Sequence, residues 1–187
     1  MEIDLLSAYL TLKTGGTILY PTDTIWGIGC DAINEQAIEK IYQVKNRTDK
    51  KGMLVLLDRM ERLQEYVTFV PEAAWHLMEE ADRPLTLIYP GARNLPPNLL
   101  GDDGSIGIRI TNDHFCQKLI HRLGHPLVST SANISTSPPP QIFNDISAEI
   151  IGSVDYVVRW RQEEDTPGEA SRIIRLHQDG TYTVIRE

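Results

Sequence analysis

The chain has 187 residues, of which 41% are hydrophobic and 24% are charged, and its formal net charge at pH 7 is -8. This length supports one sizeable buried core and is short for two ordinary domains, so we expect a single domain over residues 1–187. An acidic chain is a poor candidate for sequence-independent nucleic-acid binding over its whole surface, because neutralising phosphates requires a basic face.

The apolar runs are short, and the N-terminal segment is acidic and amphipathic. Runs such as Met53 to Leu57 fall far below the roughly 18 residues of a membrane span, and no signal peptide is recognisable. We therefore expect a cytoplasmic protein without a membrane segment. Cys30 and Cys116 have neither CxxC spacing nor histidines at ligand spacing, which predicts buried reduced thiols and no metal site.

Helical and strand-like patterns alternate through most of the chain. Apolar periodicity, with Asn34 as a cap and Gly15-Gly16 as a breaker, predicts helices over residues 5–14, 34–46, 60–67, 71–81 and 113–124. Short apolar runs predict strands over residues 17–21, 53–57, 85–90, 105–110 and 126–133, the last running into a polar loop.

The C-terminal part of the chain is rich in β-forming residues. Residues 154–160, 171–177 and 181–187 have this character, and the Gln178-Asp179-Gly180 turn predicts an antiparallel hairpin between the last two. Residues 135–140, STSPPP, are too proline-rich for regular structure and predict a stiff surface loop. The whole pattern predicts a mixed, twisted sheet flanked by helices.

The stretch YPTDTIWGIG places three polar residues directly after a predicted buried strand. Thr22, Asp23 and Thr24 follow Pro21 at the carboxyl end of that strand, where ligands usually bind in α/β sheets, and the next glycines permit close approach. The alternative is a capped turn in which Asp23 or Thr24 satisfies backbone donors.

Four cations, Lys45, Arg47, Lys50 and Lys51, cluster in this acidic chain. The helix dipole favours cations at a helix C-terminus, which accounts for the first two without a ligand. The two lysines beyond the helix, Lys50 and Lys51, repel each other, so this segment needs a bound anion to neutralise them. A phosphate chain would be such an anion. Neither G-x-x-x-x-G-K-[ST] nor G-x-G-x-x-G occurs, so a nucleotide held here would be bound by side chains.

Hydroxyls at Ser129, Thr130 and Ser131 follow an apolar strand start and precede Asn133. Strand alternation sends Ser129 and Ser131 to one face and Thr130 to the other. Half-buried hydroxyls need partners, and phosphate or carboxylate oxygens of a ligand are one source. A polar edge strand ending in an Asx turn is the alternative.

Arg109 lies in a predicted strand that otherwise consists of isoleucine and glycine. A buried arginine is costly unless paired, so it meets either an internal carboxylate or one from a substrate. No classical catalytic set accompanies the five histidines. The sequence favours a reaction in which the protein positions its substrates and neutralises charge while the substrates attack one another.

Taken in order, five blocks resemble the YrdC domain family, the threonylcarbamoyl-AMP synthases of tRNA modification. They are YPTDTIWGIGCDA, KNRTDKKGMLVLL with its K-x-R, RPLTLIYPG, SIGIRIT, and STSAN with its S-x-N. The resemblance implies the short, single-domain form, an α/β twist whose open mixed sheet is flanked by helices and carries a concave ligand cavity. It also implies a nucleotidyltransferase that converts L-threonine, bicarbonate or CO2, and ATP to threonylcarbamoyl-AMP and pyrophosphate.

The same resemblance assigns residues to the two substrates. It implies that Lys45 and Arg47 are catalytic residues that act on the phosphates. Contacts with ATP, which brings Mg²⁺ as the only cofactor, are implied for Lys45, Arg47, Lys51, Ser105, Ser131, Asn133 and Arg186. A threonine pocket is implied for Thr24, Arg109, Ser129 and Ser171. A separate transferase is implied to modify adenosine 37 of tRNAs.

One departure and two rival interpretations accompany the resemblance. Thr136 follows Ser135 where the family commonly has Ser-Gly, which leaves nucleotide contacts from that loop open. One rival is a non-catalytic, double-stranded RNA-binding module that uses the basic patch from Lys45 to Lys51. The other is a YciO-like paralogue or the carbamoyl-adenylating domain of hydrogenase maturation. The intact K-x-R and S-x-N blocks argue against the former, and missing acylphosphatase or zinc-finger-like segments argue against the latter.

Overall fold

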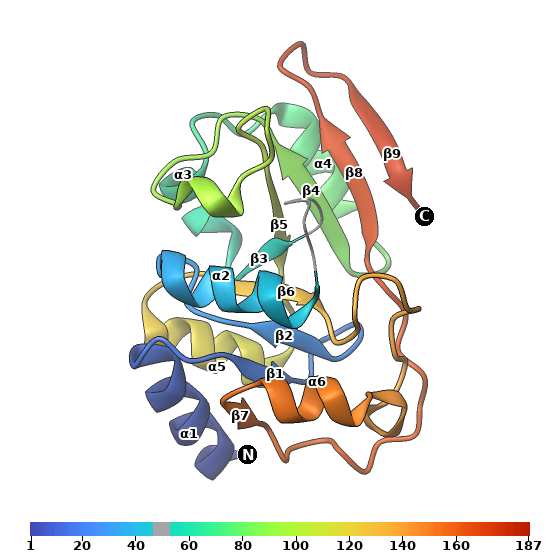
Figure 1. The fold of residues 1–187 in the computed structure, drawn as a ribbon. Helices are drawn as coiled ribbons and strands as arrows, with labels where there is room; N and C mark the ends of the chain where they lie inside the picture. Colours follow the sequence, from blue (N-terminus) through green and yellow to red (C-terminus); the bar gives the residue numbers. More distant parts are fainter. Residues whose placement is uncertain (47–52) are drawn as a thin grey trace.

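The computed structural model describes residues 1–46 and 53–187, and its described part contains one mixed sheet. The sheet order is β7-β1-β2-β6-β3-β5-β4-β8-β9 (Figure 1). Neighbours are parallel at β1·β7, β3·β5 and β4·β8 and antiparallel elsewhere. The strands are β1 (Ile18–Tyr20), β2 (Gly27–Gly29), β3 (Leu54–Leu57), β4 (Leu85–Tyr89), β5 (Ile106–Ile110), β6 (Leu127–Ser131), β7 (Tyr156–Val157), β8 (Arg172–Leu176) and β9 (Tyr182–Arg186). The predicted mixed sheet is confirmed.

Helices flank the sheet, and local sequence sets their ends. They are α1 (Glu2–Lys13), α2 (Glu35–Val44), α3 (Leu63–Tyr66), α4 (Glu72–Glu79), α5 (His114–Leu123) and α6 (Ala148–Ser153). The predicted cap of α2 is confirmed, because the Asn34 side chain accepts a hydrogen bond from the Ala37 amide at 3.0 Å. Asp113 caps α5 in the same way, and Gly124 ends that helix with a φ of 78°.

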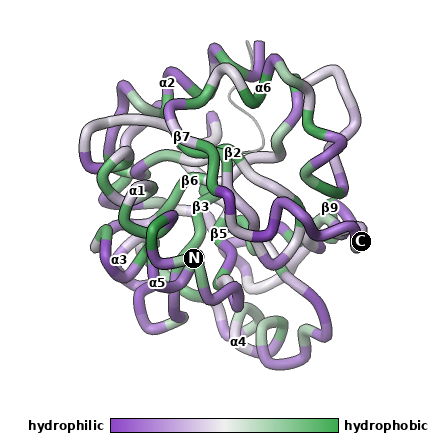
Figure 2. Tube along the Cα trace, turned by 90° about the horizontal axis from the view of Figure 1, so that it is seen from below, coloured by the Kyte–Doolittle hydropathy of each residue, from purple (hydrophilic) through white to green (hydrophobic). Residues whose placement is uncertain are grey.

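Strand alternation divides the core between the two faces of the sheet. Ile18 and Leu56 face α1 and α5 on one side, whereas Leu19 and Val55 face the core that includes α2, α4 and α6 on the other. Figure 2, viewed from below, shows α2 and α6 on one side of the strands and α5 on the other. The core that includes α1 and α5 takes strand residues from β1, β3, β6 and β7. Farther along the same face, β4, β5 and β8 line cavities.

Several predicted elements differ from the structure. Residues 154–160 contain only the two-residue β7, residues 60–67 divide into a 3₁₀ turn (Met60–Arg62) and α3, and α6 was not predicted. The sequence analysis also missed β2, which begins and ends in glycine. A Cβ at Gly29 would lie 2.3 Å from the Val128 carbonyl oxygen and 2.7 Å from the Tyr20 ring. Only glycine at this position therefore lets β2 lie so close to its neighbours.

Other expectations are confirmed. The antiparallel hairpin of β8 and β9 forms around the predicted turn. Residues 135–139 form an exposed loop without regular structure, whereas Pro140 is buried. Cys30 and Cys116 are free thiols with no measurable exposure. In the described residues, no helix has the length and apolar character needed to cross a membrane.

Candidate active site

Arg109, on β5, lines a cavity of ≈ 120 Å³. The cavity lies on the same face of the sheet as the core that includes α1 and α5. The residue is only 3% exposed. Its Nη1 donates to Thr24 Oγ1 at 2.9 Å, and its Nη2 lies 3.3 Å from Asp23 Oδ1. Its buried Nε has no hydrogen-bond partner among the described residues. An unused buried donor is costly, so an acceptor from a ligand would stabilise this arrangement.

The loop between β1 and β2 orients Thr24 toward Arg109. Thr22 Oγ1 donates to the Ile25 carbonyl oxygen at 2.8 Å and accepts from the Thr24 amide at 3.0 Å. Asp23 Oδ2 accepts from the Asn112 amide at 3.0 Å. The capped turn expected as an alternative is therefore present, and the same turn presents the Thr24 hydroxyl to the cavity.

A late segment, residues 159–171, contacts this loop, and we call it the strap. The Arg161 Nη1 donates to the Thr22 carbonyl oxygen at 3.1 Å and lies 2.9 Å from Asp113 Oδ2. A Cβ at Gly168 would lie 2.1 Å from the Thr24 carbonyl oxygen. The strap backbone therefore touches the loop backbone at a point where only glycine fits without movement.

Two serines on β6 line the same cavity. Ser129 and Ser131 share the face that alternation predicts, and Ser131 pairs with Gly27 of β2. Lys45 lies behind them and is only 2% exposed. Its Nζ donates to the carbonyl oxygens of Ser131 and Asn133 at 2.7 Å each, which fixes the turn after β6.

Residues from the strap, β8 and β9 complete the cavity wall. The Ser171 hydroxyl bonds to Thr86 Oγ1 at 2.8 Å, and the Ser171 carbonyl oxygen accepts from the Arg186 Nε at 3.0 Å. Burial and the nearby positive charge of Arg109 lower the pKa of Arg186. Two guanidinium groups and one carboxylate, that of Asp23, thus give the cavity an excess of positive charge. We call it the Arg109 pocket, lined by Thr24, Arg109, Ser129, Ser131, Ser171 and Arg186.

The family model Sua5/YciO/YrdC, described as "Telomere recombination", matches residues 10–187. The chain belongs to the Sua5/YciO/YrdC family. Curated relatives agree with this assignment. The chain is 36% identical to "Threonylcarbamoyl-AMP synthase" of Pseudoalteromonas translucida (strain TAC 125) over 81% of this chain and 83% of that protein. It is 38% identical to the protein of the same name from Thiobacillus denitrificans (strain ATCC 25259 / T1) over 72% and 71%.

Solved structures of the Sua5/YciO/YrdC family share the fold. YciO of E. coli has a TM-score of 0.86 and 26% identity, with 100% of this chain and 90% of that chain covered. The H234A/Y235A variant of P. abyssi Sua5 has a TM-score of 0.88 and 24% identity, and the alignment covers 100% of this chain and 56% of that longer chain. P. abyssi Sua5 has also been solved with L-threonine, with a TM-score of 0.82.

The structure brings most of the predicted site residues together. All four predicted threonine contacts, Thr24, Arg109, Ser129 and Ser171, line the Arg109 pocket with Ser131 and Arg186. Ser105 lines the adjacent larger cavity instead. Lys45 and Asn133 lie behind the turn, where the Asn133 side chain bonds to the Ile134 and Ser137 carbonyl oxygens. Arg47 and Lys51 lie outside the described residues.

Sequence reasoning missed the contribution of the strap. Arg161 and Gly168 lie about 140 residues from the loop that they contact, in a polar stretch without periodicity. No local pattern identifies such a contact. A glycine after Pro167 reads as an ordinary turn signal, and only the three-dimensional structure shows what a side chain there would meet.

Proposed function

We propose that this protein is a threonylcarbamoyl-AMP synthase that acts in the formation of N6-threonylcarbamoyladenosine in tRNA. The observation that carries the proposal is the buried Arg109, which lines a pocket of hydroxyls and whose Nε has no hydrogen-bond partner among the described residues. Such a pocket fits the carboxylate and the hydroxyl of an amino acid. Family membership and relatives named for this activity support the same conclusion.

The proposed reaction needs no protein nucleophile. The amine of L-threonine attacks CO2 derived from bicarbonate and loses a proton, which gives a carbamate. A carbamate oxygen then attacks the α-phosphorus of ATP, the bond to the β,γ-phosphates breaks, and pyrophosphate leaves. The protein accelerates this reaction by holding both substrates and by stabilising the charge on the leaving group.

Each side of the Arg109 pocket has a role in this scheme. Arg109 binds the threonine carboxylate, and Thr24 with Ser129 and Ser171 contacts the rest of the amino acid. The Ser131 hydroxyl and Arg186 line the same pocket, and in this scheme they meet phosphate oxygens. Lys45 contributes by holding the turn that presents Ser131, and Arg47 and Lys51 are expected to meet the phosphates.

Mg²⁺ fits this site as a companion of ATP. The described residues contain no group of three or more histidine, cysteine or acidic side chains that could hold a metal. Mg²⁺ commonly binds to phosphates with only one or two protein carboxylates. Asp23 Oδ1 is a buried oxygen that lies 3.3 Å from Arg109 Nη2 but has no hydrogen bond among the described residues, and it could supply one ligand. When bound, the ion would neutralise phosphate charge.

Pyrophosphate release tests the proposal. Purified protein with ATP, Mg²⁺ and bicarbonate should release pyrophosphate when L-threonine is added and not when it is omitted. Serine should react more slowly, because the methyl group of threonine contributes only about 1 to 3 kcal/mol in a fitted pocket. Retention of double-stranded RNA without any threonine-dependent release would instead support the RNA-binding module, and absence of both would support a YciO-like paralogue.

A further inference from the structure

Helix α1 carries apolar residues on two opposite faces. Toward the core that it shares with α5, it presents the buried residues Leu5, Ala8 and Leu12. On the other face, Ile3, Leu6 and Leu10 are 82%, 43% and 53% exposed. Their spacing of three and four residues aligns them in one row along the helix, which we call the α1 stripe. Single exposed apolar side chains are common, whereas an aligned row marks an interaction surface.

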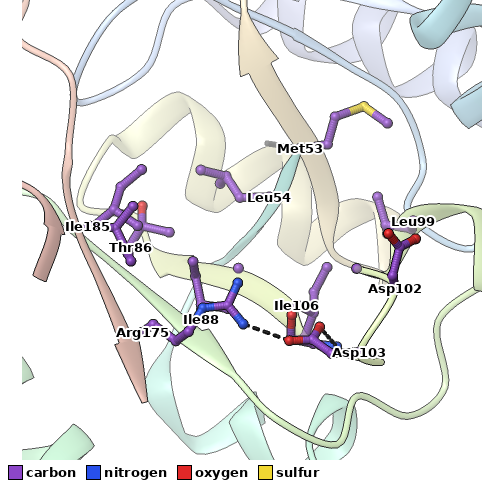
Figure 3. A pocket seen from close by; sticks show the side chains of 14 residues that line it. Met53, Leu54, Thr86, Ile88, Leu99, Asp102, Asp103, Ile106, Arg175 and Ile185 are labelled. Atoms are coloured by element: carbon purple, nitrogen blue, oxygen red, sulfur yellow. Dashed lines mark hydrogen bonds and ion pairs between the residues drawn. The ribbon is translucent and has the colours of Figure 1, made fainter. Parts of the chain in front are cut away.

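The α1 stripe is remote from the Arg109 pocket. Figure 1 shows α1 near β1 and β7, at the opposite end of the sheet from β9. Every residue of α1 is described, and none lines the Arg109 pocket or the larger cavity beside it, whose wall includes Leu54 and Ile185 (Figure 3). Ile3 and Leu6 also precede residues 10–187, which the family model matches. The stripe is therefore separate from the proposed substrate site and needs its own explanation.

Charged residues beside the stripe make it complementary to a second copy of itself. With about 3.6 residues per turn, Glu2 and Lys13 lie on the same flank of the stripe, at opposite ends of the helix. Lys13 forms no ion pair with the described residues, and Glu2 pairs with Lys118 at 3.0 Å on the exposed surface.

The direction of a helix pair through the stripe follows from these charges. In an antiparallel pair, Ile3 lies opposite Leu10 of the second copy, and Leu6 lies near the two-fold axis. The same pairing brings Lys13 of each copy within reach of Glu2 of the other. A parallel pair would instead place each charge beside its own like-charged counterpart, so the charges favour the antiparallel direction.

The charges also favour a second copy over a lipid surface. Helices that lie on membranes are typically rich in lysine and arginine on their polar face. By contrast, α1 has Glu2 and Asp4 in its first turn and Lys13 as its basic residue, and the whole chain has a net charge of -8. An anionic membrane would repel such a protein.

We propose that α1 pairs antiparallel with α1 of a second copy of this chain, so that the protein forms a two-fold symmetric dimer. A helix of 12 residues offers fewer contacts than the roughly 20 residues per partner of a stable interface. The dimer is therefore weak, and monomer and dimer exchange reversibly with concentration. This inference is independent of the proposed function.

Sedimentation equilibrium of the purified protein over a series of concentrations tests the proposal. The mean mass should rise from the 21.1 kDa of the monomer towards twice that value. Ile3→Glu places a carboxylate against Leu10 of the other copy at two symmetric positions and should weaken dimerisation at least about tenfold. An acidic residue in the first turn suits the helix dipole, so this variant should keep its melting temperature.

Phe69→Glu is the matched control for Ile3→Glu. It makes the same kind of change at a side chain that is 60% exposed, in the connection between α3 and α4. It should leave the dissociation constant of the dimer unchanged.

Exchange of the flanking charges tests the direction of the pair. Lys13→Glu and Glu2→Lys each bring like charges together at both ends of an antiparallel pair, and each should weaken dimerisation about threefold at low salt. The double variant restores opposite charges and should return the dissociation constant to within about twofold of the original. In a parallel pair, like charges meet in all of these proteins, so the exchange would change nothing.

Four results would overturn the inference. The protein stays monomeric at every concentration. The dimer persists in folded Ile3→Glu, and therefore forms through another surface. The double charge variant dimerises as weakly as the single variants. Finally, the monomeric protein binds vesicles of equal parts phosphatidylcholine and phosphatidylglycerol while Ile3→Glu does not, which would assign the stripe to a lipid surface.

Discussion

At the residue scale, Arg109 is the side chain whose loss should weaken the binding of threonine and leave the binding of ATP unchanged. Arg109→Ala is expected to raise the KM for threonine strongly while ATP binding persists, because losing a charge-assisted pair typically costs about 2 to 5 kcal/mol. Arg109→Lys should give an intermediate KM, since an ammonium group cannot replace the planar fork. Steady-state kinetics with each substrate varied, alongside a melting curve, provides the measurement.

The control for Arg109 is Arg59→Ala, which removes an exposed arginine that pairs with Asp58. It should leave both KM values unchanged. If Arg109→Ala stays folded and keeps its threonine KM, then Arg109 serves only its internal partners Asp23 and Thr24, and the assignment of the threonine pocket is wrong.

Lys45 is expected to act mainly through the turn that it holds. Lys45→Met removes the Nζ that donates to two carbonyl oxygens at 2.7 Å each and leaves both acceptors without that donor. Loss of hydrogen bonds from a charged group should lower the free energy of unfolding by about 1.5 to 3 kcal/mol, measured by urea denaturation. The exposed Lys13→Met is the control. Unchanged stability with lost ATP binding would show instead that Lys45 acts on the phosphates directly.

The site residues show how far sequence reasoning reaches at this scale. Strand alternation placed Ser129 and Ser131 correctly on one face, because the period of a strand is fixed by its backbone. The same reasoning left the partner of Arg109 open, since Asp23 lies on a different element. It also could not separate a buried Lys45 from a solvated one, because the helix dipole favours a cation at that position in either case.

At the scale of elements, the contact between the strap and the β1–β2 loop should control the position of Thr24. A Cβ at Gly168 would lie 2.1 Å from the Thr24 carbonyl oxygen, so Gly168→Ala must move one backbone or the other. We expect a higher threonine KM together with about 1 to 3 kcal/mol lower stability, the usual effect of overpacking. Kinetics and urea denaturation of the variant give both quantities.

Gly152, on α6, offers a matched control for the strap. A Cβ there meets nothing within 4 Å, and its φ is not in the left-handed region. Gly152→Ala should be neutral or stabilise the protein by up to about 1 kcal/mol, because alanine favours helix. A Gly168→Ala variant that behaves like Gly152→Ala would mean that the strap does not position Thr24.

Elements with a strong periodic signal were predictable, and elements formed by tertiary contact were not. The pattern ending at Leu123 predicted α5 to within one residue at each end, because its apolar stripe, Asp113 cap and Gly124 stop agree. By contrast, β2 consists of Gly-Ile-Gly and has weak intrinsic strand preference. It forms because its neighbours pair with it on both sides.

At the scale of the whole molecule, one sheet separates two cores, and each core contains one cysteine. Cys30 belongs to the core that includes α2, α4 and α6, whereas Cys116 belongs to the core with α1 and α5. Burial raises the pKa of both thiols, so neither forms the reactive thiolate readily in the folded protein. Single-cysteine variants therefore report separately on the opening of each face.

We expect Cys116→Ala and Cys30→Ala, each with one remaining thiol, to resist a thiol reagent at pH 8 without denaturant. Both should then become reactive over the same urea range as the loss of secondary structure, because strands shared by the two cores make their unfolding a single cooperative event. The fully unfolded variants, which should react at once, are the control. If the thiol of Cys116 reacts at lower urea than that of Cys30, the face covered by α1 and α5 opens independently, and the two cores are not one cooperative unit.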